Sequence, residues 1–355
     1  LLMLPRASMG EDVGFVDAVF TATSATCVTG LIVKDTGTDF SLMGQLVILT
    51  LIQLGGLGIV VFGAVFALLL GQALSVRESV AMQDLLSTRT ISQLGRMIVF
   101  IVTVTFIMEL IGAAGIMTMW NAGSGAAVSV QQRWYYSIFH SVSAFCNAGF
   151  SLFDDSFCGY RGSWQLYYIV CPLIILGGLG FGVLYDLFSI AVNRVHRLFS
   201  KFRRDTLYKE VPRKMALQTR IVIAASVVLV LGGTLGIMFF DRFSTVSGSE
   251  YCCGCDFREA FFQSVTSRTA GFNTVDINSM SASSRFLLIV LMFIGGSPGS
   301  SAGGIKTVTL VVIVMTVITA LRKRQEVEIF NRSVRLVIVG RAVTVLLLFL
   351  IVFFG

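Results

Sequence analysis

The stretch FHSVSAFCNAGF, from Phe139 to Phe150, has two counterparts elsewhere in the chain. One is FTATSATCVTGL (Phe20 to Leu31), and the other is FQSVTSRTAGF (Phe262 to Phe272). Each opens with Phe, continues through Ser and Thr, and closes with Gly and a large apolar residue. The closing glycines lie 119 and 122 residues apart. This even spacing indicates an internal structural repeat.

A long apolar run follows each stretch and carries a glycine pair near its middle. The pairs begin 25, 28 and 24 residues after the closing glycines, at Gly55-Gly56, Gly177-Gly178 and Gly295-Gly296. Further apolar runs precede the second and third stretches, from Met97 to Trp120 and from Ile221 to Phe240. The repeat therefore predicts a module made of a helix, a short segment and a second helix.

The composition is that of a membrane protein. Of the 355 residues, 55% are hydrophobic and 13% charged, and the mean hydropathy is +0.83. A soluble domain would be about one quarter charged, and several apolar runs reach the ~20 residues of a membrane-crossing helix. We therefore expect an all-α polytopic membrane protein with helix–pore loop–helix modules around a central pore. The chain opens without Met and ends inside an apolar run, so we expect it to be cut at both ends.

Module boundaries follow from the repeat and from the charged linkers. The predicted order is module 1 without its first helix (1–76), a linker (77–96), module 2 (97–192), a basic linker (193–214), module 3 (215–321), a linker (322–335) and the first helix of module 4 (336–355). The fourth closing glycine would lie at about 390. The linkers hold 16 Lys or Arg and 6 acidic residues, so the positive-inside rule makes them cytoplasmic. The strongest basic cluster, Arg194 to Lys214, fits topology and lipid contact, and docking of a cytoplasmic partner is an additional hypothesis.

The three short stretches are too short to cross a bilayer. Non-helical backbone at membrane depth is tolerated where it is buried or lines a water-filled path, and selectivity filters aim rings of backbone carbonyls at an ion. Glycine permits the backbone conformation that this requires. The candidate filter strands, holding K⁺ by their backbone only, are Cys27, Val28, Thr29 and Gly30; Cys146, Asn147, Ala148 and Gly149; and Arg268, Thr269, Ala270 and Gly271.

The charge pattern near these stretches favours a cation. A short helix aimed at the ion path would present its negative carboxyl end. Asp17 and Glu259 lie near the expected positive ends of two such helices. The alternative is that small residues merely allow close helix packing, but three evenly spaced copies favour the pore.

The segment GGSPGSSAGG interrupts the third module inside an apolar run. Proline lacks an N–H group, and each glycine disfavours helix by about 1 kcal/mol. Backbone groups freed in this way cannot face lipid, so we expect the segment to face the pore as a gate, with a static kink as the alternative. The gate loop comprises Gly295, Gly296, Ser297, Pro298, Gly299, Ser300, Ser301, Ala302, Gly303 and Gly304. Lys306 would either pair with an acidic side chain or extend to the cytoplasmic side.

The stretches TATSATCVTGL, SAFCNAGF, SRTAGFNTVD and GGSPGSSAGGIKT resemble the Trk/Ktr/HKT superfamily of potassium transporters, and most closely its Ktr-type membrane subunits. The resemblance implies four modules around one pore, K⁺ as the ion, and filter glycines at Gly30, Gly149 and Gly271. It also implies an intramembrane gate loop, a homodimer in a bacterial plasma membrane, and a cytoplasmic ring of nucleotide-binding (RCK-type) subunits. The chain departs from the family in length, because it lacks the fourth filter strand and does not by itself close a four-sided pore.

Several polar residues have more than one interpretation. Glu109 lies within an apolar run, so it should face the protein interior; we expect a structural pair with Arg268 rather than an ion site. The Arg268 side chain should point behind the filter, away from the ions. Cys252, Cys253 and Cys255 lack a visible fourth ligand for zinc, and a disulfide to Cys158 is the alternative.

The residues exclude most other functions. Two histidines and no paired carboxylates give no basis for catalysis, and nothing indicates a nucleic-acid partner. We predict selective K⁺ uptake across the cell membrane by a subunit in contact with lipids and regulated from the cytoplasm. The alternatives are a Na⁺- or H⁺-coupled K⁺ symporter, with Na⁺ as coupling or activating ion, and a Na⁺-selective relative. Family resemblance favours K⁺, because a Ser at the first filter glycine accompanies Na⁺ preference in the plant branch. A non-transporting membrane scaffold is a further alternative.

Overall fold

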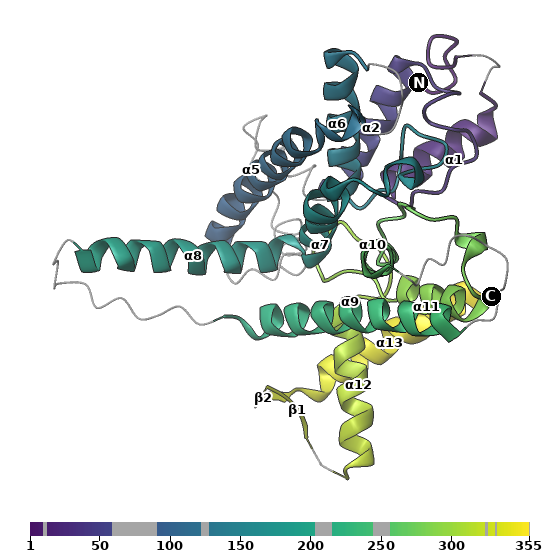
Figure 1. The fold of residues 1–355 in the computed structure, drawn as a ribbon. Coiled ribbons are helices and arrows are strands. Elements are labelled where there is room, and N and C mark those ends of the chain that lie inside the picture. The colour runs from purple at the N-terminus through teal and green to yellow at the C-terminus, as the bar shows by residue number, and fades with distance from the viewer. Residues whose placement is uncertain are drawn as a thin grey trace.

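The computed structural model describes residues 1–9, 13–58, 91–121, 128–202, 215–243, 256–323, 326–330 and 332–354. These ranges are mostly helical (Figure 1). The α-helices are α1 (Phe15–Thr26), α2 (Leu42–Leu57), α5 (Ile91–Ile116), α6 (Val130–Phe145), α7 (Cys171–Leu179), α8 (Phe181–Phe202), α9 (Leu217–Phe243), α10 (Phe257–Thr266), α11 (Ala282–Phe293), α12 (Thr307–Leu321) and α13 (Leu336–Phe354). A π-helical turn, Leu166–Val170, precedes α7.

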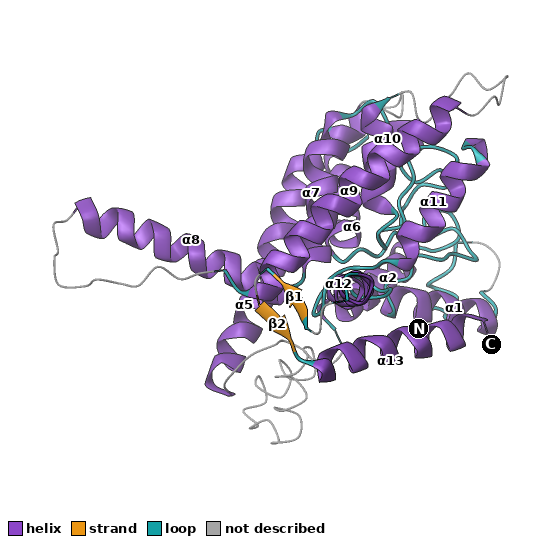
Figure 2. Cartoon of the chain, turned by 90° about the horizontal axis from the view of Figure 1, so that it is seen from below, coloured by secondary structure: helices purple, strands orange, loops and turns teal. Residues whose placement is uncertain are grey.

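The only strands in the described part form a small hairpin within the predicted linker 322–335. Strand β1 (Val327–Ile329) pairs antiparallel with β2 (Arg332–Val334). Figure 2 shows this hairpin beside α12, against which β1 packs. The all-α expectation is therefore confirmed for the membrane part, and the hairpin is an addition that sequence reasoning did not include.

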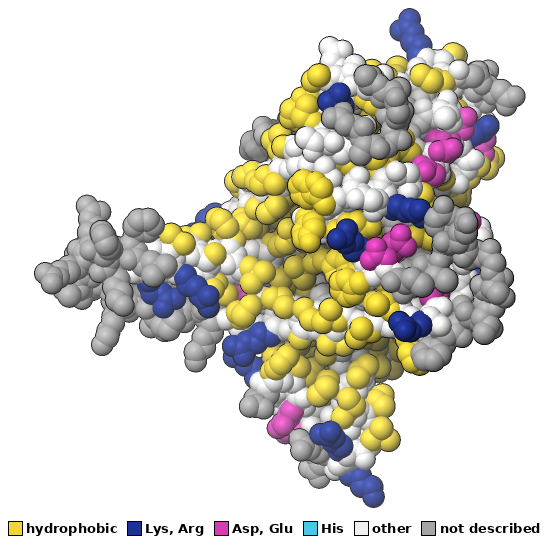
Figure 3. All heavy atoms as spheres, in the orientation of Figure 1, with side chains coloured by type: hydrophobic (Ala, Val, Ile, Leu, Met, Phe, Trp, Pro, Cys, Tyr) yellow, Lys and Arg dark blue, Asp and Glu magenta, His cyan; other side chains and the backbone are white. Residues whose placement is uncertain are grey.

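Two described helices are long and apolar enough to cross a membrane. They are Gly95–Ile116 within α5 and Leu217–Arg242 within α9, and they contain most of the two predicted apolar runs. Large hydrophobic side chains face outward on both helices; Leu110 is 65% exposed and Val228 is 68% exposed. Figure 3 shows hydrophobic side chains over much of this face, with groups of Lys and Arg along α8 and at the free end of α12 among the charged side chains. An apolar exterior of this kind is typical of a surface in contact with lipid. The protein is therefore an integral membrane protein.

The second and third modules each contain the same contact between their short helix and the long helix before it, which we call the serine joint. Ser141 on α6 donates its hydroxyl to the Glu109 carbonyl on α5, at 2.7 Å. Ser264 on α10 donates to the Val230 carbonyl on α9, at 2.8 Å. In both modules the short helix is thus fixed to the preceding long helix by the same serine, two residues after the opening Phe of the repeat.

A glycine makes each joint possible. Gly112 and Gly233 lie three residues after the accepting carbonyls, and a Cβ at either position would collide with the serine hydroxyl. Gly232, its neighbour on α9, has open space where its Cβ would be. The close approach of the two helices therefore depends on Gly233 and not on Gly232.

The helix after each short segment ends within three residues of the glycine pair in all three modules. Helix α2 ends at Leu57 before Gly58, and α7 ends before Gly180, with φ of +83° and +84° at these two glycines. Helix α8 then leaves α7 at 103° and extends away from the other helices (Figure 1). In the third module α11 ends at Phe293, at the start of the glycine-rich segment. The sequence indicated a break in the third module only, because Pro298 marks it there.

We expect opposite effects from two neighbouring substitutions in α9. Gly232→Ala should raise the melting temperature or leave it unchanged, because alanine favours helix by about 1 kcal/mol over glycine. Gly233→Ala should lower the stability by about 1–3 kcal/mol, because its Cβ would collide with the Ser264 hydroxyl and lies 2.8 Å from the Leu291 side chain. Thermal unfolding of the purified protein in detergent gives the melting temperature of both variants. Equal changes in melting temperature for the two variants would contradict the serine joint.

Candidate ion pathway

The three short helices α1, α6 and α10 end in segments with the same unusual backbone. The closing glycines have φ of +79° at Gly30, +72° at Gly149 and +81° at Gly271. Two residues before each glycine a non-glycine residue is also left-handed, with φ of +56°, +57° and +76° at Val28, Asn147 and Thr269. A left-handed non-glycine residue costs about 1–3 kcal/mol and persists only where its surroundings enforce it. Three copies of the same strained pattern therefore indicate a shared requirement.

A hydroxyl group stabilises each of these segments. Ser24 donates to the Leu31 carbonyl at 2.7 Å, Ser143 to the Phe150 carbonyl at 2.8 Å, and Thr266 to the Phe272 carbonyl at 2.8 Å. Each donor lies four residues after the opening Phe of its stretch, and each acceptor directly follows the closing glycine. The segment after the glycine is thus bound back to the short helix. Sequence reasoning missed these donors, although their fixed position in the repeat was a usable signal.

The structure brings the three closing glycines together. A Cβ at Gly30 would lie 2.5 Å from the Ala148 carbonyl oxygen. A Cβ at Gly149 would lie 2.5 Å from the Ala270 carbonyl oxygen and 3.1 Å from the Gly271 Cα. The three segments therefore abut one another, and glycine is required at the second position both by its φ and by the space available.

The short helices approach this point with their carboxyl ends. Asp17 lies in the first turn of α1 and Glu259 in the first turn of α10, as expected from the sequence. Both carboxylates are thus at the positive ends of their helices, which they stabilise. The negative ends lead directly into the segments that carry the glycines, an arrangement that favours a cation there.

The remaining predicted filter residues differ in burial. Cys146, Ala148 and Ala270 are buried, whereas Cys27 and Thr29 on the first segment are exposed. Arg268 is buried, and its guanidinium donates to the Ser226 hydroxyl on α9 at 3.2 Å. The arginine thus points toward α9.

The glycine-rich segment 295–304 forms a loop between α11 and α12. The two ends of the loop pair with each other: Gly295 N–H donates to the Ile305 carbonyl at 3.0 Å, and Thr307 N–H to the Gly296 carbonyl at 3.0 Å. The Lys306 ammonium group donates to the Ala302 carbonyl at 2.7 Å. Lys306 thus binds the backbone of the loop, a partner that the sequence analysis did not consider.

The loop is docked on the break between α7 and α8. Ser297 N–H donates to the Gly178 carbonyl at 3.0 Å, and Phe181 N–H donates to the Gly299 carbonyl at 3.0 Å. The Ser297 hydroxyl also donates to the Leu179 carbonyl. Two interrupted helices from different modules thus satisfy each other's backbone groups, as non-helical backbone inside a membrane must.

Residues 2–355 match the TrkH family of cation transport proteins. The chain belongs to the TrkH family. It is 35% identical to the Ktr system potassium uptake protein B of Bacillus subtilis, over 100% of this chain and 75% of that protein. It is 33% identical to the potassium/sodium uptake protein NtpJ of Enterococcus hirae, over 97% of this chain and 71% of that protein. The crystal structure of the potassium transporter TrkH from Vibrio parahaemolyticus has the same fold, with a TM-score of 0.61 and 22% identity, over 94% of this chain and 62% of that one.

The carboxylate of Glu109 contacts the second segment of this TrkH-family protein at Cys146. Gln53 on α2 donates its amide to Glu109 at 3.3 Å, and the Cys146 thiol lies 3.9 Å from the other carboxylate oxygen. The expected pair of Glu109 with Arg268 is therefore wrong: the two residues bind different partners. Gln53, a lone amide in an apolar run, was a signal that sequence reasoning did not use.

The repeat supplies an internal comparison for this polar pair. Glu109 and Val230 hold the same place, since their carbonyls accept from the equivalent serines of α6 and α10. Gln53 and Ile175 each precede the glycine pair of their module by two residues. Ile175 and Val230 belong to one hydrophobic cluster. The interface between the first two modules thus has Gln53 and Glu109 at the positions that Ile175 and Val230 occupy in the next modules.

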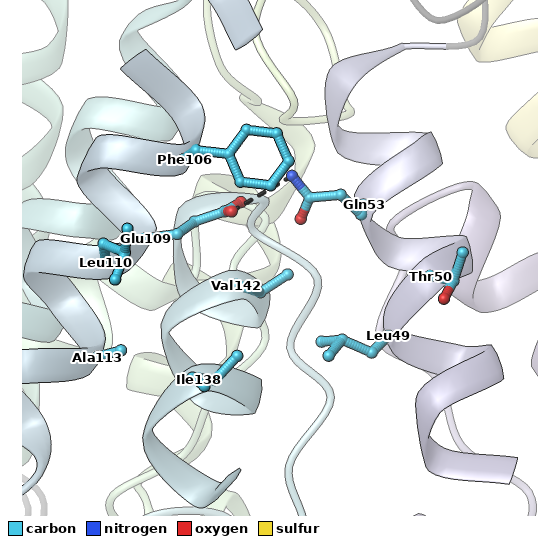
Figure 4. A pocket seen from close by; sticks show the side chains of 9 residues that line it. All are labelled: Leu49, Thr50, Gln53, Phe106, Glu109, Leu110, Ala113, Ile138 and Val142. Atoms are coloured by element: carbon cyan, nitrogen blue, oxygen red, sulfur yellow. Dashed lines mark hydrogen bonds between the residues drawn. The ribbon is translucent and has the colours of Figure 1, made fainter. Parts of the chain in front are cut away.

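A cavity of about 370 Å³ lies beside Glu109, between α2, α5 and α6 (Figure 4). It is lined by Leu49, Thr50, Gln53, Phe106, Glu109, Leu110, Ala113, Ile138 and Val142. Figure 4 shows Gln53 and Glu109 turned toward each other at one end, with mostly apolar side chains and Thr50 over the rest. The cavity therefore has a single polar end, formed by the pair described above.

The cysteines give no metal site in the described part of the chain. Cys252, Cys253 and Cys255 lie outside the described residues. Cys158 is a free thiol, and it donates to the Asn273 carbonyl at 3.8 Å. Within the described ranges, no group of three or more His, Cys, Asp or Glu side chains could hold a metal ion.

The Gln53–Glu109 pair can be tested with the Ile175–Val230 pair as a template. Gln53→Ile alone should lower the free energy of unfolding by about 1–3 kcal/mol, because it removes the amide that binds a buried carboxylate. Adding Glu109→Val should restore the stability to near the wild-type value, because exchanging both partners for apolar groups is close to neutral. Melting temperatures in detergent at one pH report the difference. A double variant that is no more stable than the single variant would show that the pair is not coupled.

Proposed function

We propose that this protein is the membrane subunit of a potassium uptake system. The observation that carries the proposal is the meeting of three glycine-closed segments at the negative ends of three short helices. Their backbone would supply three of the four strands of a selectivity filter, with one glycine per strand, and K⁺ would bind to backbone carbonyls only. The names of the Ktr relatives from Bacillus subtilis support K⁺ as the ion.

The filter strands in this proposal are Cys27 to Gly30, Cys146 to Gly149, and Arg268 to Gly271. Loop 295–304 would act as the gate of the same pathway, because it has few side chains, interrupts a membrane helix, and lies against Asn147 of the second strand. A passive gated pore is the main candidate. A Na⁺- or H⁺-coupled mechanism is the second candidate, favoured by the potassium/sodium uptake protein among the relatives.

The proposed setting is a bacterial plasma membrane, with the linkers between modules on the cytoplasmic side. The name "Ktr system" supports an assembly of more than one component. We propose a homodimer of membrane subunits regulated by a cytoplasmic nucleotide-binding ring of the RCK type. Cross-linking and mass measurement of the full-length protein in detergent, with and without the regulatory subunit, test the stoichiometry.

Gly149→Ser should relax ion selectivity. Its side chain would be placed at a φ of +72° and 2.5 Å from the Ala270 carbonyl oxygen. We expect the K⁺ over Na⁺ preference to fall by roughly tenfold, equal to about 1.4 kcal/mol, in flux measurements on proteoliposomes with the full-length protein. Gly162→Ser, at a glycine with open space around it, is the control and should behave as wild type. Wild-type protein that passes neither K⁺ nor Na⁺ would overturn the proposed function.

Deleting Pro298 to Gly303 tests the gate separately. The deletion removes most of the docked loop, so K⁺ flux should rise severalfold while the protein remains folded. Flux into proteoliposomes gives the effect, and the melting temperature in detergent reports the fold. Unchanged flux through a folded variant would make the loop a static bend rather than a gate.

A further inference from the structure

The side chain of Asn147 sets the second filter strand apart from the other two. Val28 and Thr269 occupy the same left-handed position in the first and third strands, so an amide is not needed to form this backbone. Asn147 is nevertheless buried, with 1% of its surface exposed. A buried amide must satisfy its hydrogen-bonding groups within the protein, and the partners it finds define what it does.

Asn147 has partners on two other elements. Its amide group lies 3.1 Å from the Ser301 hydroxyl. In the amide orientation that satisfies all neighbouring groups, the nitrogen donates to the Ile174 carbonyl, and the oxygen accepts from Gly178 N–H and from the Ser301 hydroxyl, each at 3.1 Å. Ile174 and Gly178 belong to the end of α7, and Ser301 belongs to loop 295–304. One side chain thus connects a filter strand, the broken helix of its own module and the loop of the next module.

Ser301 connects the loop to the same place by further contacts. Its hydroxyl lies 3.4 Å from the Gly177 carbonyl and 3.5 Å from the Phe145 carbonyl at the end of α6. The neighbouring Ser300 donates to the Ser297 carbonyl at 2.7 Å, which is a bond within the loop. Of two adjacent serines, one therefore binds the filter strand and its helix, and the other binds only the loop.

Movement of the loop and the state of the strand are therefore linked. If loop 295–304 leaves the α7–α8 break, the Ser301 hydroxyl leaves with it, and the buried Asn147 oxygen loses one of its partners. Conversely, a shift of Asn147 in the strand weakens the docking of the loop. Such coupling is reciprocal by thermodynamic necessity.

We propose that Asn147 and Ser301 form a contact through which the docking of the loop controls the geometry of the second filter strand. Asn147 is a positioning residue in this proposal, and the consequence is that flux and ion selectivity change together. The inference rests on the proposed function, and it adds a specific connection between the two parts of the pathway.

The test compares two serine variants in proteoliposomes with the full-length protein, measuring K⁺ flux and K⁺ over Na⁺ selectivity. Ser301→Ala should raise K⁺ flux and also lower the selectivity by roughly fivefold or more. Ser300→Ala is the matched control: it removes a bond inside the loop, so it can alter flux, but its selectivity should equal that of wild type. Equal selectivity in Ser301→Ala and wild type would overturn the proposal, as would an equal loss in both variants.

A double-mutant cycle separates coupling from a general loss of structure. Asn147→Thr installs the residue of the third strand, which supports the same backbone at Thr269 but lacks the amide. If the contact couples the two sites, Asn147→Thr combined with Ser301→Ala should shift selectivity no further than either change alone. Additive shifts would show that the two residues act independently and would refute the inference. The proposed function is judged by wild type and Gly149→Ser, so it can stand or fall separately.

Discussion

Backbone that leaves a helix inside a membrane must find hydrogen-bond partners within the protein, because lipid offers none. The structure meets this constraint in two ways. In each short segment a Ser or Thr hydroxyl donates a hydrogen bond to the carbonyl of the residue after the closing glycine. Between modules, the interrupted helix ends at Gly180 and in loop 295–304 pair with each other. The positions of the filter candidates and of the loop both follow from these bonds.

The bonds between modules allow loop 295–304 to leave the break between α7 and α8. The backbone bonds from Ser297 and Phe181 to the half-buried residues Gly178 and Gly299 are modest individually, with a net value of about 0.5–1.5 kcal/mol each. A small set of such bonds can hold a loop in place and still release it, whereas a packed helix could not be released at similar cost. Because no large side chains lie between Gly295 and Gly304, the docking consists of backbone hydrogen bonds and of contacts from the Ser297 and Ser301 hydroxyls.

The modules share the same backbone conformation at equivalent positions, but they differ in some of the side chains there. The serine joints of α6 and α10, the left-handed positions and the glycine breaks recur from module to module. Gln53 and Glu109 occupy the positions that Ile175 and Val230 hold in the next modules, and Asn147 lies where the other strands have Val28 and Thr269. Features common to all modules belong to the shared architecture, and features found in one module are the places where individual properties of the pathway should reside.

The sequence by itself determined the class of protein, the repeat, the long helices α5, α9 and α13, and the glycines of the candidate filter. These follow from local patterns: apolar runs of membrane length, fixed spacing, and residues with special backbone freedom. Only the tertiary structure decided that the chain bends by 103° between α7 and α8, that Glu109 binds Gln53 instead of Arg268, and that Lys306 binds the Ala302 carbonyl. Partners of buried polar groups depend on which segments distant in sequence come together, and no local pattern encodes that choice.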